Sequence, residues 1–222
     1  MEIIYQNDQF LAINKPAGQI VIPGRGARER LSLKKEIADS LKAKIYVVHR
    51  LDTETSGLIL FAKTAETHAE LSRLFETRKV KKCYWAIVQG KIENAGSVDK
   101  PLKAFGSGRM GISPLGKPSQ TLYQVKKLFK DTTWLEIQPL TGRRHQIRVH
   151  LYSLGHPILG ETRYGPKQTE FPRSDASMRT GPISTSDRLM LHAYQLEFTL
   201  FSKKFTLTAP IPEDFLKILN SL

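Results

Sequence analysis

Hydrophobic and polar positions along the chain follow two different periods, which divide it into short strands and helices. Runs or alternations of apolar residues between turn residues predict β-strands at 3–5, 10–13, 45–48, 58–62, 82–89, 121–129, 133–138, 189–200 and 205–208. Helices are expected at 31–41, 65–77, 142–154 and 215–219. Hairpins mixed with helices, rather than regular alternation of strand and helix, predict an α+β fold with a mixed, largely antiparallel central sheet and flanking helices.

One long segment lacks any such period. Residues 160–188 are rich in Gly, Pro, Ser, Thr and Arg, and a loop of this length inside a compact domain is usually functional or mobile. We find no internal repeat and no clear linker, so we expect one domain spanning residues 1–222.

The charge balance indicates the kind of partner. The chain has 34 lysines and arginines against 21 aspartates and glutamates, a net charge of +13, which attracts a polyanion such as nucleic acid. A membrane partner is disfavoured because no apolar run approaches the roughly 18 residues that span a bilayer. Residues 1–10 lack the pattern of a signal peptide, and Cys83 is the only cysteine, so no internal disulfide can form. We therefore expect a cytoplasmic protein without a membrane association.

The segment from His49 to Gly57 gives the strongest indication of chemistry. It joins two expected strands and places Asp52 between Arg50 and a turn that ends at Gly57. Loops between rigid strands commonly carry catalytic side chains, because the scaffold fixes their position. The plainer interpretation is that the Asp52 side chain only caps the turn.

Two other segments favour chemistry at Asp52. Tyr84 lies on the expected strand 82–89, and the expected helix 142–154 places Arg148 about 100° from Ile147, at the border of its apolar face. Arg148 can reach inward from there and pair with Asp52, which would hold the pKa of that carboxyl below its usual range. A carboxylate nucleophile requires that ionised state. Alternatively, Tyr84 is a core residue and the arginines form a solvated helix face.

Several motifs occur in a familiar order along nearly the whole chain. They are His49–Gly57 with Leu58 and Ile59, the turn Lys15–Gly18, the spacing of Lys82, Tyr84 and Ala86, the run 142–151 followed by 155–158, Gly116–Pro118 with Thr121 and Tyr123, Tyr164 with Gly165, and Leu191–Ala193. In these motifs the chain resembles the RluA family of pseudouridine synthases.

The resemblance implies that a uridine within RNA is isomerised: the N-glycosidic bond breaks, the uracil turns, and a carbon–carbon bond forms to C5. It implies no cofactor and no metal. Asp52 matches the catalytic aspartate, which acts either as a nucleophile at C1′ or as a base that starts elimination. Tyr84 matches the tyrosine that stacks on the base and is a candidate for assisting removal of the C5 proton. Arg148 matches the basic residue that pairs with the aspartate.

Such an enzyme cannot reach C1′ and C5 inside a stacked helix, so the nucleotide must be flipped out. Arg50 matches the residue that fills the vacated space, which suits a planar cation. Single-stranded loops lower the cost of flipping, so a tRNA or rRNA stem-loop is the expected substrate.

Other residues are expected to bind RNA in a cleft of the catalytic fold. The first set is His49, Thr55, Arg143, Arg144 and His145. Surface cations that could contribute are Lys34, Lys35, Arg73, Arg78, Lys79, Lys81, Arg109, Arg173 and Arg179.

Some features depart from the family pattern. Glu54 stands where the family usually has Asp, and Arg144 where it usually has Thr, which bears on the substrate rather than on activity. Many relatives carry an amino-terminal S4-type RNA-binding domain, for which there is no room before Lys15. We therefore expect the short form, acting as a monomer with no obligatory protein partner.

Three other functions compete with this interpretation. A metal hydrolase is disfavoured because His145 and His150 are five residues apart, not the four that align two zinc ligands on a helix. A retaining glycosidase needs two carboxylates about 5 to 5.5 Å apart, and only Glu54 accompanies Asp52. A catalytically inactive basic RNA-binding protein remains the alternative from another class, although Asp52, Tyr84 and Arg148 are all present.

Overall fold

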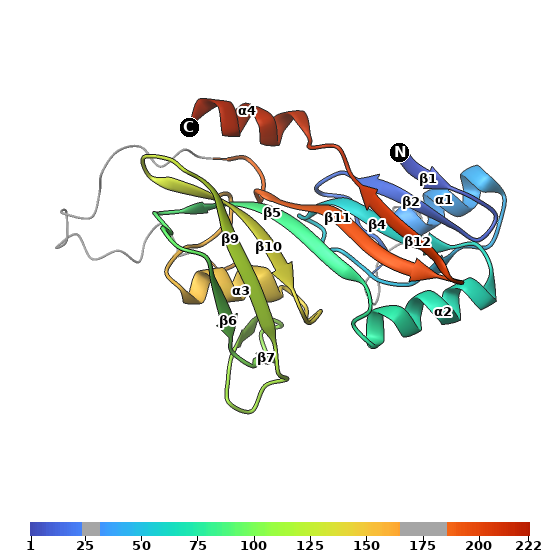
Figure 1. Ribbon diagram of the computed structural model, residues 1–222, viewed down its shortest axis with the longest axis horizontal. Helices are drawn as coiled ribbons and strands as arrows, with labels where there is room; N and C mark the ends of the chain where they lie inside the picture. The colour runs from blue at the N-terminus through green and yellow to red at the C-terminus, as the bar shows by residue number, and fades with distance from the viewer. Residues whose placement is uncertain (24–31, 165–185) are drawn as a thin grey trace. The chain divides into compact units, whose positions relative to one another are not determined.

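The computed structural model describes residues 1–23, 32–164 and 186–222 (Figure 1). Contacts divide the chain into two compact units. The first contains Met1–Tyr84 and His192–Ile211, and the second contains Trp85–Leu191 and Pro212–Leu222. The prediction of one domain over residues 1–222 therefore stays a prediction.

The first unit is a sheet with a helix on each face. Its elements are β1 (Glu2–Gln6), β2 (Phe10–Lys15), α1 (Leu33–Leu41), β3 (Tyr46–Val47), β4 (Ser56–Ala62), α2 (Ala65–Glu76), the start of β5 (Lys81–Gln89), most of β11 (Leu191–Leu200), and β12 (Lys203–Thr208). The strand order is β1-β2-β4-β11, with β3 on β4 and β12 on β11. Strand β2 pairs antiparallel with β1 and β4, whereas β4 and β11 pair in parallel.

Strand β4 is buried along its whole length because both faces of this sheet are covered. Leu58 and Leu60 belong to the core that includes Leu71 of α2. Their neighbours Ile59 and Phe61 face the opposite way, into the core that includes Ile37 of α1. An apolar run without polar alternation is the sequence signature of such a strand.

The second unit combines an antiparallel sheet, a small hairpin and two helices. Its elements are the end of β5, β6 (Gly96–Asp99), β7 (Leu102–Ala104), β8 (Met110–Ile112), β9 (Gln120–Leu128), β10 (Thr132–Pro139), α3 (Gln146–Ser153) and α4 (Glu213–Ser221). Its strand order is β5-β10-β9-β6, and β7 pairs with β8 in a separate hairpin.

The α+β class with a mixed, largely antiparallel sheet is confirmed, and so is Thr64 as the cap of α2, since its hydroxyl accepts from the Thr67 backbone N–H. The start of the helix expected over 142–154 is wrong, because α3 begins at Gln146. His145 has a φ of 53°, which ends helical continuity toward Arg144. Strands β6, β7 and β8 were not predicted, since each has only three or four residues. Leu31 and positions 165–185 of the expected 160–188 loop lie outside the described residues.

Gly57 permits the parallel contact between β4 and β11. Its φ is +112°, and a Cβ there would lie 2.3 Å from the Ala193 carbonyl oxygen. The neighbour is backbone of a paired strand, so it cannot move aside without breaking the pairing of Gly57 with Ala193. A side chain at this position is excluded by both conformation and space.

Replacing Gly57 by alanine should therefore lower the free energy of unfolding by about 3 kcal/mol or more. Gly155→Ala is the matched control, because Gly155 also has a positive φ of 83° but a Cβ added there would meet nothing within 4 Å. There the loss should be about 1 kcal/mol, from backbone strain alone. Urea unfolding followed by circular dichroism measures both, and equal losses would contradict the close approach.

Candidate active site

Asp52 opens a tight turn in the first unit, directly before β4. The Thr55 backbone N–H donates to the Asp52 carbonyl oxygen at 3.1 Å, which closes the turn. Thr53 and Glu54 are exposed at its tip, Asp52 is half-buried, and Thr55 is buried. The backbone geometry thus presents the Asp52 side chain beside the start of a rigid strand, as expected from the sequence.

A buried lysine holds this turn from the other side. Lys15 is fully buried, and its ammonium group donates to the carbonyl oxygens of Pro16, Gln19 and Thr53 at 2.8, 2.9 and 3.0 Å. The Gly18 N–H also donates to the Thr53 carbonyl, at 2.8 Å. The turn at 15–18, which the sequence marked only as a motif, is therefore tied to the tip of the Asp52 turn.

The beginning of β4 is fixed by a second polar contact. The Ser56 hydroxyl lies 2.9 Å from Nδ1 of His192, and both side chains are buried. His192 is paired with Ser56 in the parallel register of β4 and β11. The Asp52 turn is thus anchored before and after its tip.

Tyr84 is electrostatically coupled to Asp52. Burial of the phenol raises the pKa of Tyr84 above its usual value, and the negative charge of Asp52 raises it further. Tyr84 packs against the core that contains Ile59 and Phe61. The structure therefore brings the predicted carboxylate and the predicted phenol together in the first unit, with the phenol in its neutral form at pH 7.

His49 and Arg50 have different environments, although they are neighbours. The His49 ring stacks on Phe75 at a centroid distance of 4.3 Å, and its Nε2 accepts from the Leu60 backbone N–H at 3.0 Å. Burial, with a smaller contribution from the positive charge of Lys82, lowers the pKa of His49 to about 3. His49 is thus a neutral acceptor that holds β4, while Arg50 is exposed and open to a ligand. RNA contacts by His49, Arg50 and Thr55 stay predictions.

In the second unit, Arg143, Arg144 and His145 lie on a loop rather than on the expected helix. The Gln146 side chain causes this, because its Oε1 accepts from the Thr141 hydroxyl at 2.7 Å and from the Arg143 N–H at 3.0 Å. Its amide nitrogen donates to the Gln120 carbonyl at 2.9 Å. Gln146 therefore folds the basic loop against β9, with Arg144 exposed and Arg143 half-buried.

Arg148 is buried, as the inward reach predicted from its helix position requires. Its exposed fraction is 1%, and it forms a two-point ion pair with Glu161, with N–O distances of 2.6 and 2.7 Å. Burial alone would raise the pKa of Glu161, but the hydrogen bonds and charge of Arg148 outweigh burial and hold that pKa below its usual value. Asp52 belongs to the other unit, so its pairing with Arg148 stays a prediction.

Tyr164 joins the residues of this second group. Its hydroxyl lies 2.5 Å from Nδ1 of His145 and accepts from the Met110 N–H at 3.1 Å. The Arg148 guanidinium lies 5.4 Å from the Tyr164 ring centroid. Tyr164 is buried, so these contacts fix the His145 ring beside Arg148.

The two histidines considered as metal ligands have different hydrogen-bond partners. His145 contacts Tyr164, whereas His150 lies 2.9 Å from the Thr121 hydroxyl and 3.0 Å from the Lys100 carbonyl. Over residues 1–23, 32–164 and 186–222, no three His, Cys, Asp or Glu side chains gather as metal ligands would.

The sequence alone did not predict the structural contacts of several residues. Lys15, Tyr164 and His192 were quoted only as parts of motifs, and their contacts depend on partners far along the chain. Glu161 carried no signal, because it is a lone carboxylate at the start of an irregular segment. Arg173 and Arg179, named as surface cations, lie outside the described residues.

Comparison with known proteins identifies the family. Residues 9–153 match the family described as RNA pseudouridylate synthase. The chain belongs to this family. A ribosomal large subunit pseudouridine synthase D from Vibrio vulnificus (strain CMCP6) is 35% identical across 100% of this chain and 70% of its own length. The dual-specificity RNA pseudouridine synthase RluA of Vibrio cholerae is 37% identical over 97% of this chain and 84% of its own.

Solved structures agree with the family. Human RNA Pseudouridylate Synthase Domain Containing 4 is 29% identical, with a TM-score of 0.76 over 99% of this chain and 92% of that one. Human RNA Pseudouridylate Synthase Domain Containing 1 is 27% identical, with a TM-score of 0.74 over 95% and 83%. The resemblance found in the sequence motifs is confirmed, and the chain is an RNA pseudouridine synthase that isomerises uridine within RNA.

The family match spans Asp52, Tyr84 and Arg148 but ends before Glu161 and Tyr164. In this synthase the residues that contact the Arg148 guanidinium, Glu161 and Tyr164, thus lie beyond the matched segment. In the part of the chain that the structure describes, no helix is long and apolar enough to cross a membrane.

The neutral His49 makes stability depend on pH. Its pKa is lowered from 6.5 to about 3 on folding, so its stabilisation is complete above pH 6.5 and is lost as the pH falls toward 3. His49→Gln removes the titration and keeps an acceptor. Between pH 7 and pH 4 the parent should lose about 3 kcal/mol more unfolding free energy than this variant, measured by urea unfolding. Parallel losses in the two proteins would show that His49 does not carry this pH dependence.

The ion pair of Arg148 with Glu161 should be costly to break from one side. Glu161→Gln leaves the arginine charge buried, so the unfolding free energy should fall by about 3 kcal/mol or more. Asp214→Asn is the comparison, because Asp214 pairs with Arg188 at 2.7 Å but is 57% exposed. That change should cost less than about 1 kcal/mol. Thermal and urea unfolding of the two variants measure the difference, and a Glu161→Gln protein as stable as the parent would refute the role of the pair.

Proposed function

We propose that this synthase converts a uridine in an RNA stem-loop to pseudouridine by using Asp52 as its catalytic group on a flipped-out nucleotide. The observation that carries the proposal is the electrostatic effect of Asp52 on Tyr84. A half-buried carboxylate on an anchored turn lies close enough to a phenol to raise the pKa of that phenol. Both residues lie within the range 9–153 that matches the family.

The reaction balances without any other reactant. In the substitution route the Asp52 carboxylate bonds to C1′, and the N1–C1′ bond breaks with its electron pair going to uracil. After the base turns, C5 bonds to C1′ and the carboxylate is released. C5 then loses its proton, and N1 gains one. In the elimination route Asp52 instead takes the C2′ proton while a C1′–C2′ double bond forms and the N1–C1′ bond breaks. When C5 bonds to C1′, that proton returns to C2′, so the carboxylate is regenerated in both cases.

Tyr84 acts in this proposal mainly as a neutral stacking surface. A phenol whose pKa is raised is rarely a phenolate at neutral pH, so it is a poor base without a change in its surroundings. Its ring can stack on uracil, and its hydroxyl can guide the turned base.

Arg148 and Arg50 supply positive charge at different steps. We propose that Arg148, held rigid by Glu161 and Tyr164, keeps Asp52 ionised. The exposed Arg50 fills the gap left by the flipped nucleotide, where a planar cation can stack and contact phosphate. His49 and Thr55 position this segment, while Arg143, Arg144 and His145 contact the RNA backbone.

The printed names of relatives suggest the class of RNA. Several are ribosomal large subunit synthases and one is named as dual-specificity, so we propose a stem-loop of rRNA, tRNA or both as the substrate. We also propose that both units act together as one catalytic domain, in a cytoplasmic monomer that needs no protein partner.

The proposal predicts that Asp52→Asn abolishes catalysis but not RNA binding. Tritium release from cellular RNA labelled at uridine C5 should fall by about 1,000-fold or more, because the amide cannot act as nucleophile or base. The Kd for the same RNA should change by less than about threefold, because phosphate contacts dominate affinity.

Glu54→Gln is the matched control, since it removes one negative charge from the exposed tip of the same turn. It should retain nearly full activity. If the parent releases no tritium from any cellular RNA, the protein is instead the inactive RNA-binding protein considered from the sequence. If Asp52→Asn loses RNA binding while it stays folded, the proposed separation of binding and catalysis is wrong.

A further inference from the structure

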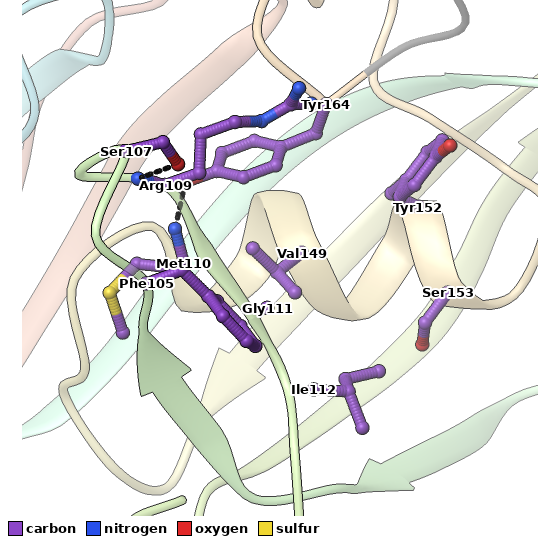
Figure 2. A pocket seen from close by; sticks show the side chains of 10 residues that line it. All are labelled: Phe105, Ser107, Arg109, Met110, Gly111, Ile112, Val149, Tyr152, Ser153 and Tyr164. Carbon is purple, nitrogen blue, oxygen red and sulfur yellow. Dashed lines mark hydrogen bonds between the residues drawn. The ribbon is translucent and has the colours of Figure 1, made fainter.

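A pocket of about 460 Å³ lies in the second unit (Figure 2). The hairpin β7–β8 and its loop form one wall, α3 forms another, and Tyr164 completes it. The lining residues are Phe105, Ser107, Arg109, Met110, Gly111, Ile112, Val149, Tyr152, Ser153 and Tyr164. Asp52 and Tyr84 are not among them, so the pocket is made by other residues than those proposed to act on the target uridine.

The walls of this pocket present aromatic surface to solvent. Phe105 is 49% exposed and Tyr152 is 43% exposed, and exposed apolar surface of this kind often marks a binding site. The Phe105 ring packs closely on Gly111 of the hairpin, since a Cβ on Gly111 would be only 2.8 Å from its Cε2 atom. The hairpin turn is closed by hydrogen bonds between Phe105 and Arg109, at 2.9 Å, and between Gly108 and Phe105, at 2.8 Å. The aromatic wall is therefore built on a defined backbone.

Positive charge surrounds the apolar interior. Arg109 lines the pocket, and its guanidinium lies 5.6 Å from the Tyr164 ring. Arg144 and Arg163 both donate to the Gly108 carbonyl at the hairpin turn. None of the ten lining residues is acidic. Aromatic faces combined with a cationic rim are the chemistry that binds unpaired nucleotides, with bases on the rings and phosphates on the cations.

Tyr164 connects this pocket with the RNA-binding residues of the same unit. Tyr164 lines the pocket. Its hydroxyl contacts His145, and its ring makes a cation–π contact with the Arg148 guanidinium. In Figure 2 a dashed line joins the Tyr164 hydroxyl to the Met110 N–H of the hairpin. A ligand in the pocket would thus contact Tyr164, the side chain that positions His145.

We propose that the pocket binds a second unpaired base of the RNA substrate, by stacking on Phe105 and Tyr152 while Arg109 contacts the adjoining phosphate. The proposal rests on the function proposed above, because it assumes an RNA with an open loop. It assigns the β7–β8 hairpin a part in choosing substrates, since a fully paired stem offers no base to the pocket.

The test compares two probes that carry the same phosphates. One is a uridine 12-mer, and the other is a 12-mer in which tetrahydrofuran abasic units replace every nucleoside. Phe105→Ala and Tyr152→Ala should each raise the Kd for the uridine 12-mer by about fivefold or more, as loss of base stacking does elsewhere. The Kd for the abasic 12-mer should stay within about twofold of the parent value, because its phosphate contacts remain.

Phe201→Ala is the matched control, because Phe201 is 44% exposed but belongs to the first unit, beside β11 and β12. It should leave both Kd values unchanged. In a second measurement, a 12-mer containing 4-thiouridine should photocrosslink to peptides that contain Phe105 or Tyr152 in the parent.

The outcomes separate this inference from the proposed function. Equal effects of Phe105→Ala on the two Kd values, or no effect on either, would show that the pocket does not bind a base. With no effect on either, a protein partner would be the remaining ligand for this surface. If the parent nevertheless releases tritium from uridine-labelled RNA, the proposed function stands alone. Base-dependent binding and crosslinking without any tritium release would support the pocket and refute the enzyme mechanism.

Discussion

The ammonium group of Lys15 is the contact on which the geometry around Asp52 depends. A charge that is fully buried is costly unless polar atoms replace its water, and here the carbonyl oxygens of Pro16, Gln19 and Thr53 do so. Two of these carbonyls belong to the turn after β2, and the third belongs to the tip of the Asp52 turn. The lysine therefore fixes two turns that are far apart in sequence. Because the backbone is held in this way, the point from which the Asp52 side chain projects is fixed.

The second unit uses the same principle with a different pair of charges. Arg148 and Glu161 are each about 1% exposed and satisfy one another at two points. Such a pair contributes little net stability, because desolvation offsets most of the attraction, but it fixes the planar guanidinium in one orientation. Two backbone N–H groups, from Arg163 and Tyr164, also donate to Glu161, at 2.7 and 3.2 Å. In both units, the main effect of the buried charges is to fix the positions of the groups around them, and their net contribution to stability is small.

The sequence predicted the elements whose signals are local. Strands β4 and β5 were found because their apolar residues form runs or alternations, and α2 because Thr64 caps an amphipathic segment. The start of α3 could not be predicted, since it depends on Gln146 bonding to Gln120 on a strand 26 positions earlier. The predicted chemistry near Asp52 and Tyr84 followed from motifs, but the contacts of Lys15 and Glu161 require tertiary structure. The short strands β7 and β8, which carry the aromatic pocket, have too few residues for any period to show.

The first unit is assembled from two distant parts of the chain, and this has a consequence for its synthesis. Ser56 and His192, which meet beside the Asp52 turn, are 136 positions apart. At typical translation rates, on the order of 10 s passes between the emergence of the two residues from the ribosome. Until then β4 lacks its parallel neighbour, so the apolar edge of a half-made sheet is left open to chaperones or to other nascent chains. The Asp52 turn is therefore made well before the strand that completes its surroundings.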